Sequence, residues 1–452
     1  MVGPLFPPGA DVVVISSFEE GRAVLRSEDF VVAFGANSPR VQLDPEGSVH
    51  LAGGARAREG DGADGMPWTE FFNANEVHFM HGTAHARRRR SLAPLFGRDA
   101  HIWARDKVIV PTLVVRLNAV LARPGPDGLP RTDIVPFARQ LFAQVASGLI
   151  GLDGADSEDV LHELLGIAER MDAALMLVHD KMEASVEQSE RILQDAVAAR
   201  SEFRRRFYEP SLRRRAQLLA RHRSGDLAEG ELPHDLLTVI ARGVPTFEDP
   251  EAGVAQAGAF LSPLTSGTAS MLVHALADLV VWFGAHPDDA RRWAHPAFLE
   301  GAITETIRLH QPVVIPRLAR KDLALPSGRT IRRGQYVAIT RLETNRDPSV
   351  FGADADSYDP RRTVPPGVYP FGLGFGSGPH MCVALPLVLG QGGISGLLAP
   401  VLRALFSVGV KPDPGQPARK VGHGFPFREV YVSYPVTFDR VRTLPAAAIA
   451  ET

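Results

Sequence analysis

The segment Phe375-Gly376-Ser377-Gly378-Pro379-His380-Met381-Cys382-Val383-Ala384 decides the fold of this chain. It holds the only cysteine of the sequence, inside a glycine-rich turn that runs into an apolar, helix-like segment. A cysteine at the start of a helix lies near unpaired backbone N–H groups and the positive end of the helix dipole, and both favour the thiolate. We therefore expect Cys382 to be a metal ligand or a nucleophile, and an inert buried cysteine is the alternative.

The spacing around this cysteine separates these possibilities. Phe375 lies seven residues before Cys382, Gly378 four before, His380 two before, and Ala384 two after. This pattern resembles the heme-binding loop of the cytochrome P-450 family. In that family the cysteine is the proximal ligand of the heme iron, the two small residues let the backbone approach the porphyrin, and the phenylalanine packs beside the sulfur. The resemblance implies heme b (iron protoporphyrin IX) as cofactor, with Cys382 as the metal ligand and the other four residues as cofactor-binding residues.

Composition limits the class of protein. The chain has 452 residues, of which 45% are hydrophobic, and a formal net charge of −3. Such a charge gives no reason to expect a nucleic-acid partner. A single cysteine excludes an intramolecular disulfide and suits a reducing compartment. The N-terminus lacks a basic segment and its apolar run is too short to cross a membrane, so we expect a cytoplasmic monomer with no membrane segment.

Apolar periodicity predicts a mainly helical fold. Residues 106–122, 136–152, 157–179 and 182–222 have helical apolar spacing. Residues 35–68 are rich in Gly, Ala, Asp and Pro and are predicted as a long loop. A strand is expected at 12–16, and 323–325, 330–331 and 335–339 are predicted to form a β-meander. The expected fold class is mainly α with a small β region, as a single cytochrome P-450-like domain over residues 1–452.

Two local features concern helix ends. Ser17 and Glu20 have the spacing of a capping box at the start of a first helix. Beyond Cys382 a helix is expected in which glycines at positions 390, 392, 393 and 396 each weaken the helix by about 1 kcal/mol relative to alanine. By the resemblance, small residues there permit close packing under the heme.

A basic helix is predicted from His81 to about Phe96, with arginine at positions 87 to 90. His85 and Arg89 are four residues apart and share a face, so they can bind one anion together. A solvated basic face is the alternative. By the resemblance, these two residues hold a heme propionate and Arg317 is a second propionate ligand. The other arginines of the run are expected toward the proximal surface, where an acidic electron donor docks.

A long, nearly uncharged helix is predicted from about residue 250 to residue 283. A helix that is apolar on all sides must be buried. Pro263 removes one backbone hydrogen bond, and Ser, Thr and Gly residues lie beside it. We therefore expect a kink or a local opening of the helix at Pro263. By its place in the chain, this segment is similar to the central helix of the P-450 family, which crosses the distal face of the heme.

The acid and threonine that this family carries on its central helix are missing here. They align with Ser266 and Gly267, which cannot deliver protons in the usual way. A one-residue bulge at Pro263 would bring Thr265 or Thr268 into place. The candidate catalytic residues are therefore Thr265, Ser266 and Thr268, and water or a polar group of the substrate are alternative proton sources.

Other residues carry structural or pocket roles by the resemblance. Glu305 and Arg308 are three residues apart and meet on one helical face. The resemblance implies that this pair is buried, is completed by Arg362, and holds the fold. A terminal hairpin is expected around residues 425–436. The substrate pocket is expected to involve Phe79, Phe260, Leu264, Val313, Val314, Phe425 and Phe427.

The resemblance implies a heme-thiolate monooxygenase that hydroxylates or otherwise oxidises an organic small molecule, such as a bacterial secondary metabolite. Its electrons are expected from a ferredoxin and a ferredoxin reductase, because the chain has no flavin or iron–sulfur motif. One alternative is a heme-thiolate enzyme without ordinary oxygen activation, which would act by peroxide-driven oxidation, radical coupling or isomerisation. Another is a non-catalytic heme carrier or sensor. A cysteine hydrolase built on Cys382 and His380 would leave the propionate-type residues and the central helix unexplained.

Overall fold

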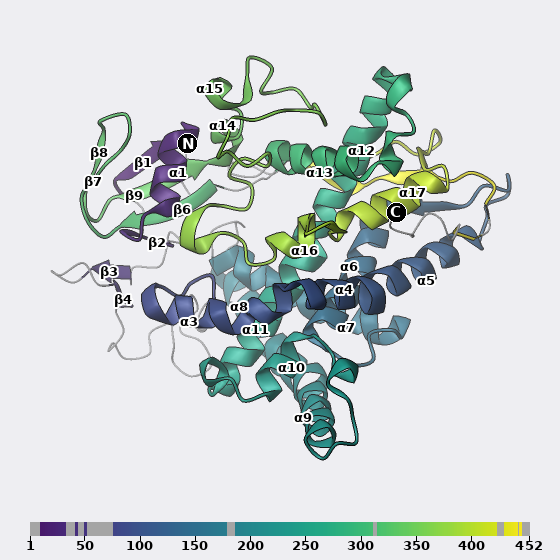
Figure 1. The fold of residues 1–452 in the computed structure, drawn as a ribbon, viewed down its shortest axis with the longest axis horizontal. Coiled ribbons are helices and arrows are strands. Elements are labelled where there is room, and N and C mark those ends of the chain that lie inside the picture. The colour runs from purple at the N-terminus through teal and green to yellow at the C-terminus, as the bar shows by residue number, and fades with distance from the viewer. Residues whose placement is uncertain are drawn as a thin grey trace.

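The computed structural model describes residues 10–32, 41–43, 49–51, 76–178, 186–310, 314–422, 429–441 and 443–444. Val313, Phe425 and Phe427 lie outside these ranges, as does most of the loop predicted for residues 35–68. Within that predicted loop, strands β3 (Val41–Leu43) and β4 (Val49–Leu51) pair antiparallel, so this part of the loop prediction is wrong. Figure 1 shows the main sheet at one end of the molecule beside α1, with helices filling the rest.

Helices make up most of the described chain and confirm the predicted fold class. Their bounds are α1 Phe18–Arg26, α3 Gly82–Leu92, α4 Arg98–Ala104, α5 Val110–Leu121, α6 Ile134–Ile150, α7 Glu158–Val178, α8 Val186–Phe203, α9 Glu209–Arg223, α10 Leu236–Ala241, α11 Pro250–Ser262, α12 Ala269–Ala285, α13 Pro296–His310, α14 Arg341–Thr344, α15 Pro348–Phe351, α16 Leu385–Leu389 and α17 Leu398–Ser407. The four segments predicted from apolar periodicity all fall on helices.

The main sheet has four strands in the order β1, β9, β6, β2. The bounds of the remaining strands are β1 Val12–Ile15, β2 Phe30–Val32, β5 Arg131–Asp133, β6 Val314–Ala319, β7 Leu323–Ala324, β8 Thr330–Ile331, β9 Tyr336–Thr340, β10 Gly390–Gln391, β11 Ile394–Ser395, β12 Lys411–Pro412, β13 Arg419–Gly422, β14 Glu429–Ser433 and β15 Pro435–Thr437. β1 runs parallel to β9, whereas β6 pairs antiparallel with both β9 and β2. Strands β13 and β14 form the predicted terminal hairpin.

The predicted β-meander is wrong in its third strand. β7 pairs with β8, but β9 leaves them and pairs with β1 and β6. The residues from Val337 to Thr340 are all buried. A strand buried on both faces needs hydrogen-bond partners at both edges, and β1 and β6 supply them.

The predicted capping box at α1 is also wrong. Ser17 makes no side-chain hydrogen bond to the helix. Instead the backbone N–H of Phe18 donates to Oδ2 of Asp347, at 2.9 Å. Glu20 accepts hydrogen bonds from Ser327 and Arg329. Tertiary partners therefore replace the local cap that the sequence spacing suggested.

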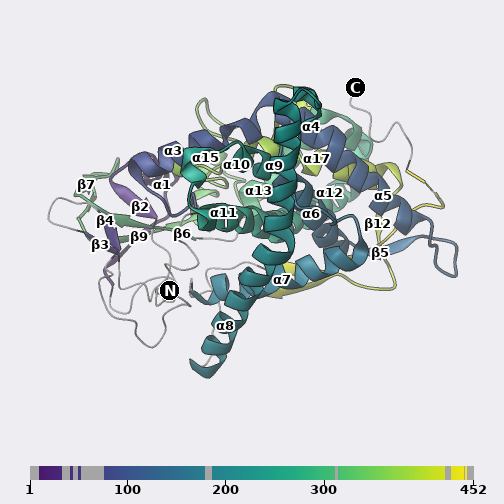
Figure 2. The ribbon, with the colours of Figure 1, turned by 90° about the horizontal axis from the view of Figure 1, so that it is seen from below.

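The central helix is interrupted at the predicted place. α11 and α12 are joined by a π-helical turn over Pro263–Thr268, so the helix opens at the proline. Figure 2 shows α11 and α12 inside the helical part of the molecule with α6 and α7 beside them, and these helices pack on one another. The whole segment Pro250–Ala285 is long and apolar enough to cross a membrane by length and composition. More than half of its most apolar window (56%) is buried within the protein, as in a core helix.

Candidate functional site

The cysteine loop is held by its own backbone. The N–H of Cys382 donates to the carbonyl of Phe375, at 2.8 Å, and residues Gly378–His380 form a 3₁₀ turn. Phe375 is half-buried and packs edge-on against Phe371, with ring centroids 5.1 Å apart. Cys382 is half-buried. The loop thus presents one sulfur on a backbone that is fixed at both ends.

The protein alone does not favour the thiolate. Burial raises the pKa of the Cys382 thiol above its ordinary value, and it outweighs the backbone N–H groups of Ala384 and Leu385 and the guanidinium groups of Arg89 and Arg341. The expectation that the helix start would favour the thiolate is therefore wrong for the chain by itself. The physical reason is that burial disfavours the charged thiolate more than these N–H groups and cations favour it, and α16, with only five residues, is a short helix. A metal ion bound to the sulfur would reverse this preference.

A contact with α1 requires a glycine at position 378. Its φ is +69°, and a Cβ atom there would lie 2.5 Å from the carbonyl oxygen of Leu25 and 2.8 Å from Cα of Arg26. The C-terminal end of α1 therefore occupies the space beside this glycine. Nε of Arg26 also donates to the hydroxyl of Ser377, at 3.2 Å. The glycine allows α1 to pack on the cysteine loop.

The helix expected beyond Cys382 ends early. α16 stops at Leu389, the short strands β10 and β11 follow, and α17 begins at Leu398. Gly390 has φ +95°, and a Cβ atom there would lie 2.2 Å from the carbonyl oxygen of Ile394. The expectation of one glycine-weakened helix is wrong, because these glycines form a turn that a side chain would block.

The predicted propionate residues come together beside the cysteine loop. The rings of His85 and His380 stack with centroids 4.2 Å apart, and the ring of His81 meets His380 edge-on. Nη1 of Arg89 donates to the carbonyl of Met381, at 2.6 Å. Arg317 is buried on β6, and its positive charge contributes to lowering the pKa of His380. Burial, the first cause in each case, lowers the pKa of His81 and His85 to about 4 and that of His380 to about 2, so these rings are neutral at pH 7.

The charges at this site fit an anionic cofactor. Nη1 of Arg317 donates to the carbonyl of Pro316, and burial lowers the pKa of Arg317 to about 10. Within the described ranges, neither Arg89 nor Arg317 forms an ion pair with a carboxylate. A buried cation ordinarily requires a negative partner. The donor set therefore suits the two carboxylates of a heme beside a cysteine ligand.

Arg341 belongs to the same region and was missed by the sequence reasoning. Its Nη1 donates to the carbonyl of Gly374, at 2.7 Å, and its charge lowers the pKa of Cys382. Burial lowers the pKa of Arg341 to about 10. The sequence signal that could have pointed to Arg341 is its position directly after a strand of buried residues.

One arginine of the basic helix does not lie where it was expected. Arg88 is buried, donates to the carbonyl of Thr246 at 2.7 Å, and lies over the ring of Phe247. Arg87 and Arg90 are exposed, as the interpretation of a basic surface requires. Arg88 therefore fastens α3 to the segment that precedes α11, and it does not contribute to the surface.

The three candidate hydroxyl groups of the central helix lie at the π-helical turn. Thr265 is buried and donates to the carbonyls of Leu261 (2.8 Å) and Ser262 (3.0 Å). Ser266 is exposed and donates to the carbonyl of Ser262, at 2.8 Å. Thr268 is buried and donates to the carbonyl of Pro263, at 3.4 Å. Ser266 is thus the one of the three that faces open space.

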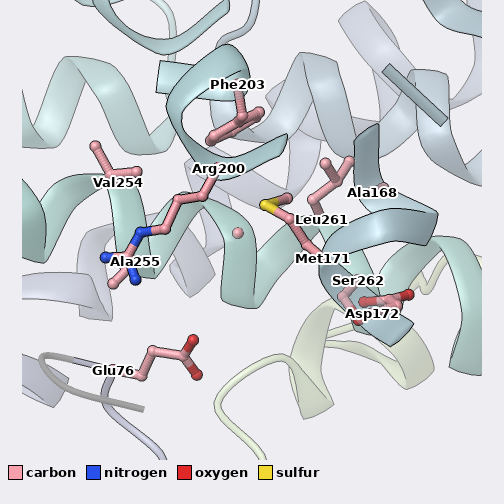
Figure 3. A pocket seen from close by; sticks show the side chains of 11 residues that line it. Glu76, Ala168, Met171, Asp172, Arg200, Phe203, Val254, Ala255, Leu261 and Ser262 are labelled. Atoms are coloured by element: carbon pink, nitrogen blue, oxygen red, sulfur yellow. The ribbon is translucent and has the colours of Figure 1, made fainter. Parts of the chain in front are cut away.

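Four of the substrate-pocket candidates lie within the described ranges. Phe79 and Phe260 are half-buried, and Phe260 meets Phe96 edge-on with centroids 6.1 Å apart. Leu264 is buried in the main core, and Val314 is buried in a small cluster with Ala338. None of these residues lines the cavity of about 40 Å³ in Figure 3, which borders α11.

Glu305, Arg308 and Arg362 form a buried network. Arg308 donates from Nε and Nη2 to the two carboxylate oxygens of Glu305, each at 2.7 Å, and Arg362 donates to Glu305 from Nε at 2.9 Å. Arg308 also donates to the carbonyls of Asn345 and Ala355. The network joins α13 to the segments before and after α15.

Comparison with known proteins agrees with this geometry. The family model described as Cytochrome P450 matches residues 285–387. Human cytochrome P450 4F2 is 32% identical over 132 residues, which are 28% of this chain and 24% of that protein. Indoleacetaldoxime dehydratase of Arabidopsis thaliana is 33% identical over 100 residues, which are 21% of this chain and 20% of that protein. The matched region therefore spans about a quarter or less of the length of these relatives.

Solved structures match over nearly the whole chain. CalO2 has a TM-score of 0.64 at 21% identity and covers 97% of this chain and 93% of its own. CYP109E1 from Bacillus megaterium, in complex with corticosterone, has a TM-score of 0.64 at 14% identity and covers 97% and 95%. The whole chain thus has the fold of these P450 structures, and its residues 285–387 match the Cytochrome P450 family model.

Proposed function

We propose that this protein is a heme-thiolate monooxygenase that oxidises an organic small molecule, with electrons from a ferredoxin and its reductase. The observation that carries the proposal is a pair of arginines, the half-buried Arg89 and the buried Arg317, which lie beside the cysteine loop without a carboxylate partner in the described ranges. Heme b would supply two carboxylates for them and an iron for Cys382. Bound in this way, it supplies oxygen activation and electron transfer.

The chain's own residues have separate tasks in this proposal. Cys382 binds the metal as thiolate, and Arg89 and Arg341 favour its negative charge. Arg89, Arg317, His85 and His380 hold the two carboxylates in one orientation, since charge-assisted hydrogen bonds are shorter and stronger than neutral ones. The neutral histidines donate hydrogen bonds without adding further positive charge to a buried site.

The substrate is proposed to be a secondary metabolite of bacterial type. HmtT, described as involved in himastatin biosynthesis, covers 96% of this chain with a TM-score of 0.62 at 20% identity. An epothilone D-bound P450epoK structure covers 96% with a TM-score of 0.63 at 19% identity. At such identities the fold is what is shared, so these names support only a class of substrate. A cytoplasmic monomer is part of the same proposal.

The deciding experiment compares the wild type with Cys382→Ser. The wild type is expected to purify with heme, and its reduced carbon monoxide adduct is expected to absorb as a thiolate-ligated iron does. The Cys382→Ser variant should lose that absorption. A variant that keeps it, or a wild type with a histidine-type spectrum, would contradict the ligand assignment.

A second measurement separates the enzyme from a carrier or a sensor. Compound libraries are screened for a shift of the heme absorption, and each binder is offered with ferredoxin, reductase and dioxygen, or with hydrogen peroxide. Electron consumption that depends on the binder, together with an oxidised product, supports the monooxygenase. Binding without electron consumption or product under either condition would favour a carrier or a sensor.

A further inference from the structure

A small cavity lies beside the central helix where the helix opens. It has a volume of about 40 Å³ and lies between α7, α8 and the C-terminal half of α11 (Figure 3). Most of its wall is apolar, but Glu76, Asp172, Arg200 and Ser262 bring polar groups to it. A buried water needs about 10–15 Å³ and two to four polar partners. The cavity therefore has room for water among these four residues.

Asp172 is the unusual group of this cavity. It comes from α7, and its Oδ1 atom is buried with no hydrogen-bond partner among the residues that the structure describes. Burial raises the pKa of Asp172 to about 6, with a smaller increase from Glu169, and a hydrogen bond with Ser262 and the charge of Arg139 oppose the rise. An acid with this pKa exchanges its proton close to neutral pH, as a general acid must.

Glu76 is a second acid at the same cavity and lies across it from Asp172 in Figure 3. It is 8% exposed, and burial raises its pKa to about 8 while Arg200 opposes the rise. Arg200 itself pairs with Glu251, at 3.1 Å. Glu76 is therefore protonated at neutral pH, and it can resupply a proton to water in the cavity.

Ser262 connects the cavity to the open side of the central helix. Its side chain lines the cavity and it is the last residue of α11, immediately before the π-helical turn. Its carbonyl accepts the hydroxyl of Ser266, so the exposed Ser266 lies one turn further along the helix. Between Glu251 and Asp278 the helix contains no acid of its own.

We propose that Asp172 is the proton donor that the central helix lacks, and that Ser262 passes its protons toward Ser266. The proton leaves an oxygen of Asp172 for the hydroxyl of Ser262, and that hydroxyl releases its own proton to a water on the side of the π-helical turn where Ser266 is exposed. The Asp172 carboxylate is then reprotonated from the cavity. This proposal rests on the proposed function, in which hydroxylation of one C–H bond by dioxygen consumes two protons and two electrons from reduced ferredoxin and releases one water.

The first test is the variant Asp172→Asn, with Glu169→Gln as the matched control. Glu169 lies one turn earlier on α7, where it is exposed and pairs with Arg139. Asp172→Asn should lower ferredoxin-supported turnover with dioxygen about 100-fold, at the low end of general acid catalysis. Turnover with hydrogen peroxide should stay within about twofold, because peroxide brings its own two protons. The fall of wild-type turnover as pH rises through about 6, where Asp172 loses its proton, should be absent from the pH profile of Asp172→Asn.

A second variant tests the connection. Ser262→Ala leaves both acids in place but removes the hydroxyl between Asp172 and the π-helical turn. It should show the same selective loss of dioxygen-supported turnover, with the carbon monoxide spectrum of the wild type as proof of an intact site. Dioxygen-supported turnover within about twofold of the wild type in either variant would overturn the proposal.

An infrared titration measures the protonation of the Asp172 carboxyl group directly and needs no turnover. As pH rises, the carboxylic acid band of Asp172 should disappear with a midpoint near pH 6 in the wild type and at a slightly lower pH in Glu169→Gln, which lacks the charge of Glu169, and the band should be absent from Asp172→Asn. If the wild type turns over with neither oxidant, the proposed function fails, and this titration still decides whether Asp172 is an acid near neutrality. A wild type without such a band, or one active with peroxide alone, would overturn the proposed donor.

Discussion

The substitution Glu305→Ala tests whether the buried network on α13 holds the fold. The carboxylate of Glu305 accepts four hydrogen bonds: two from Arg308, one from Arg362 and one from the backbone N–H of Asp359. Glu305 is 2% exposed and Arg308 is 1% exposed. Removing the carboxylate leaves two guanidinium groups side by side, and that of Arg308 cannot reach solvent.

The size of the loss follows from these contacts. Four hydrogen bonds to charged groups, at about 1.5–3 kcal/mol each, would sum to roughly 6–12 kcal/mol. Arg308 retains the carbonyls of Asn345, Ala355 and Ser357, so the sum overstates the cost. Breaking a buried pair by removing one partner costs about 3–5 kcal/mol. The free energy of unfolding of a whole protein is only about 5–15 kcal/mol, so we expect insoluble or heme-free protein.

The assay expresses Glu305→Ala beside the wild type and the control Glu300→Ala. Glu300 lies on the same helix, but its side chain is exposed. Soluble yield, the ratio of heme to protein, and the denaturant midpoint are measured for all three proteins. The control should behave as the wild type does. A soluble, heme-loaded Glu305→Ala protein with normal unfolding but no activity would refute the structural reasoning and assign Glu305 a catalytic role.

Three further predictions concern the other buried groups. Arg317→Ala should lower the ratio of heme to protein, since it removes a buried cation from the propionate site, and full heme retention would contradict that role. Between pH 4.5 and 8 the raised pKa of Glu76 makes the wild type lose stability as pH rises, so the free energy of unfolding of Glu76→Gln should increase relative to the wild type by up to about 1.4 kcal/mol per pH unit. If the free energies of unfolding of the two proteins change in parallel with pH, burial of this acid is refuted. Gly390→Ala should lower the denaturant midpoint, because the new Cβ atom would lie 2.2 Å from the carbonyl oxygen of Ile394, and an unchanged midpoint would show that the turn relaxes.

The sequence predicted those parts of the site that depend on fixed local spacing. The loop around Cys382, the shared face of His85 and Arg89, and the pair on α13 each follow from residues two to seven positions apart. The π-helical turn also followed from a local cause, because Pro263 lacks an N–H group. Such features survive folding because their geometry is set mainly by the backbone near them.

The features that sequence missed are set by distant partners. Asp172 and Glu76 meet at one cavity only because α7 packs on α11, and no local pattern marks either acid. The capping box at Ser17 failed because Asp347, far along the chain, offers a carboxylate to the same N–H group. The approach of α1 to Gly378, which requires a glycine there, is likewise not visible in the local sequence.

The pairing of the first strand with β9 sets the order in which this protein can fold during its synthesis. The hydroxyl of Thr340 donates to the carbonyl of Ile15, and the two residues are 325 positions apart in the chain. At about 5–20 residues per second, the ribosome needs roughly 15–65 s to make the partner after the first strand has emerged. The four-stranded sheet therefore closes only after most helices have been made, and until then the apolar strand β1 depends on other contacts or on chaperones for protection.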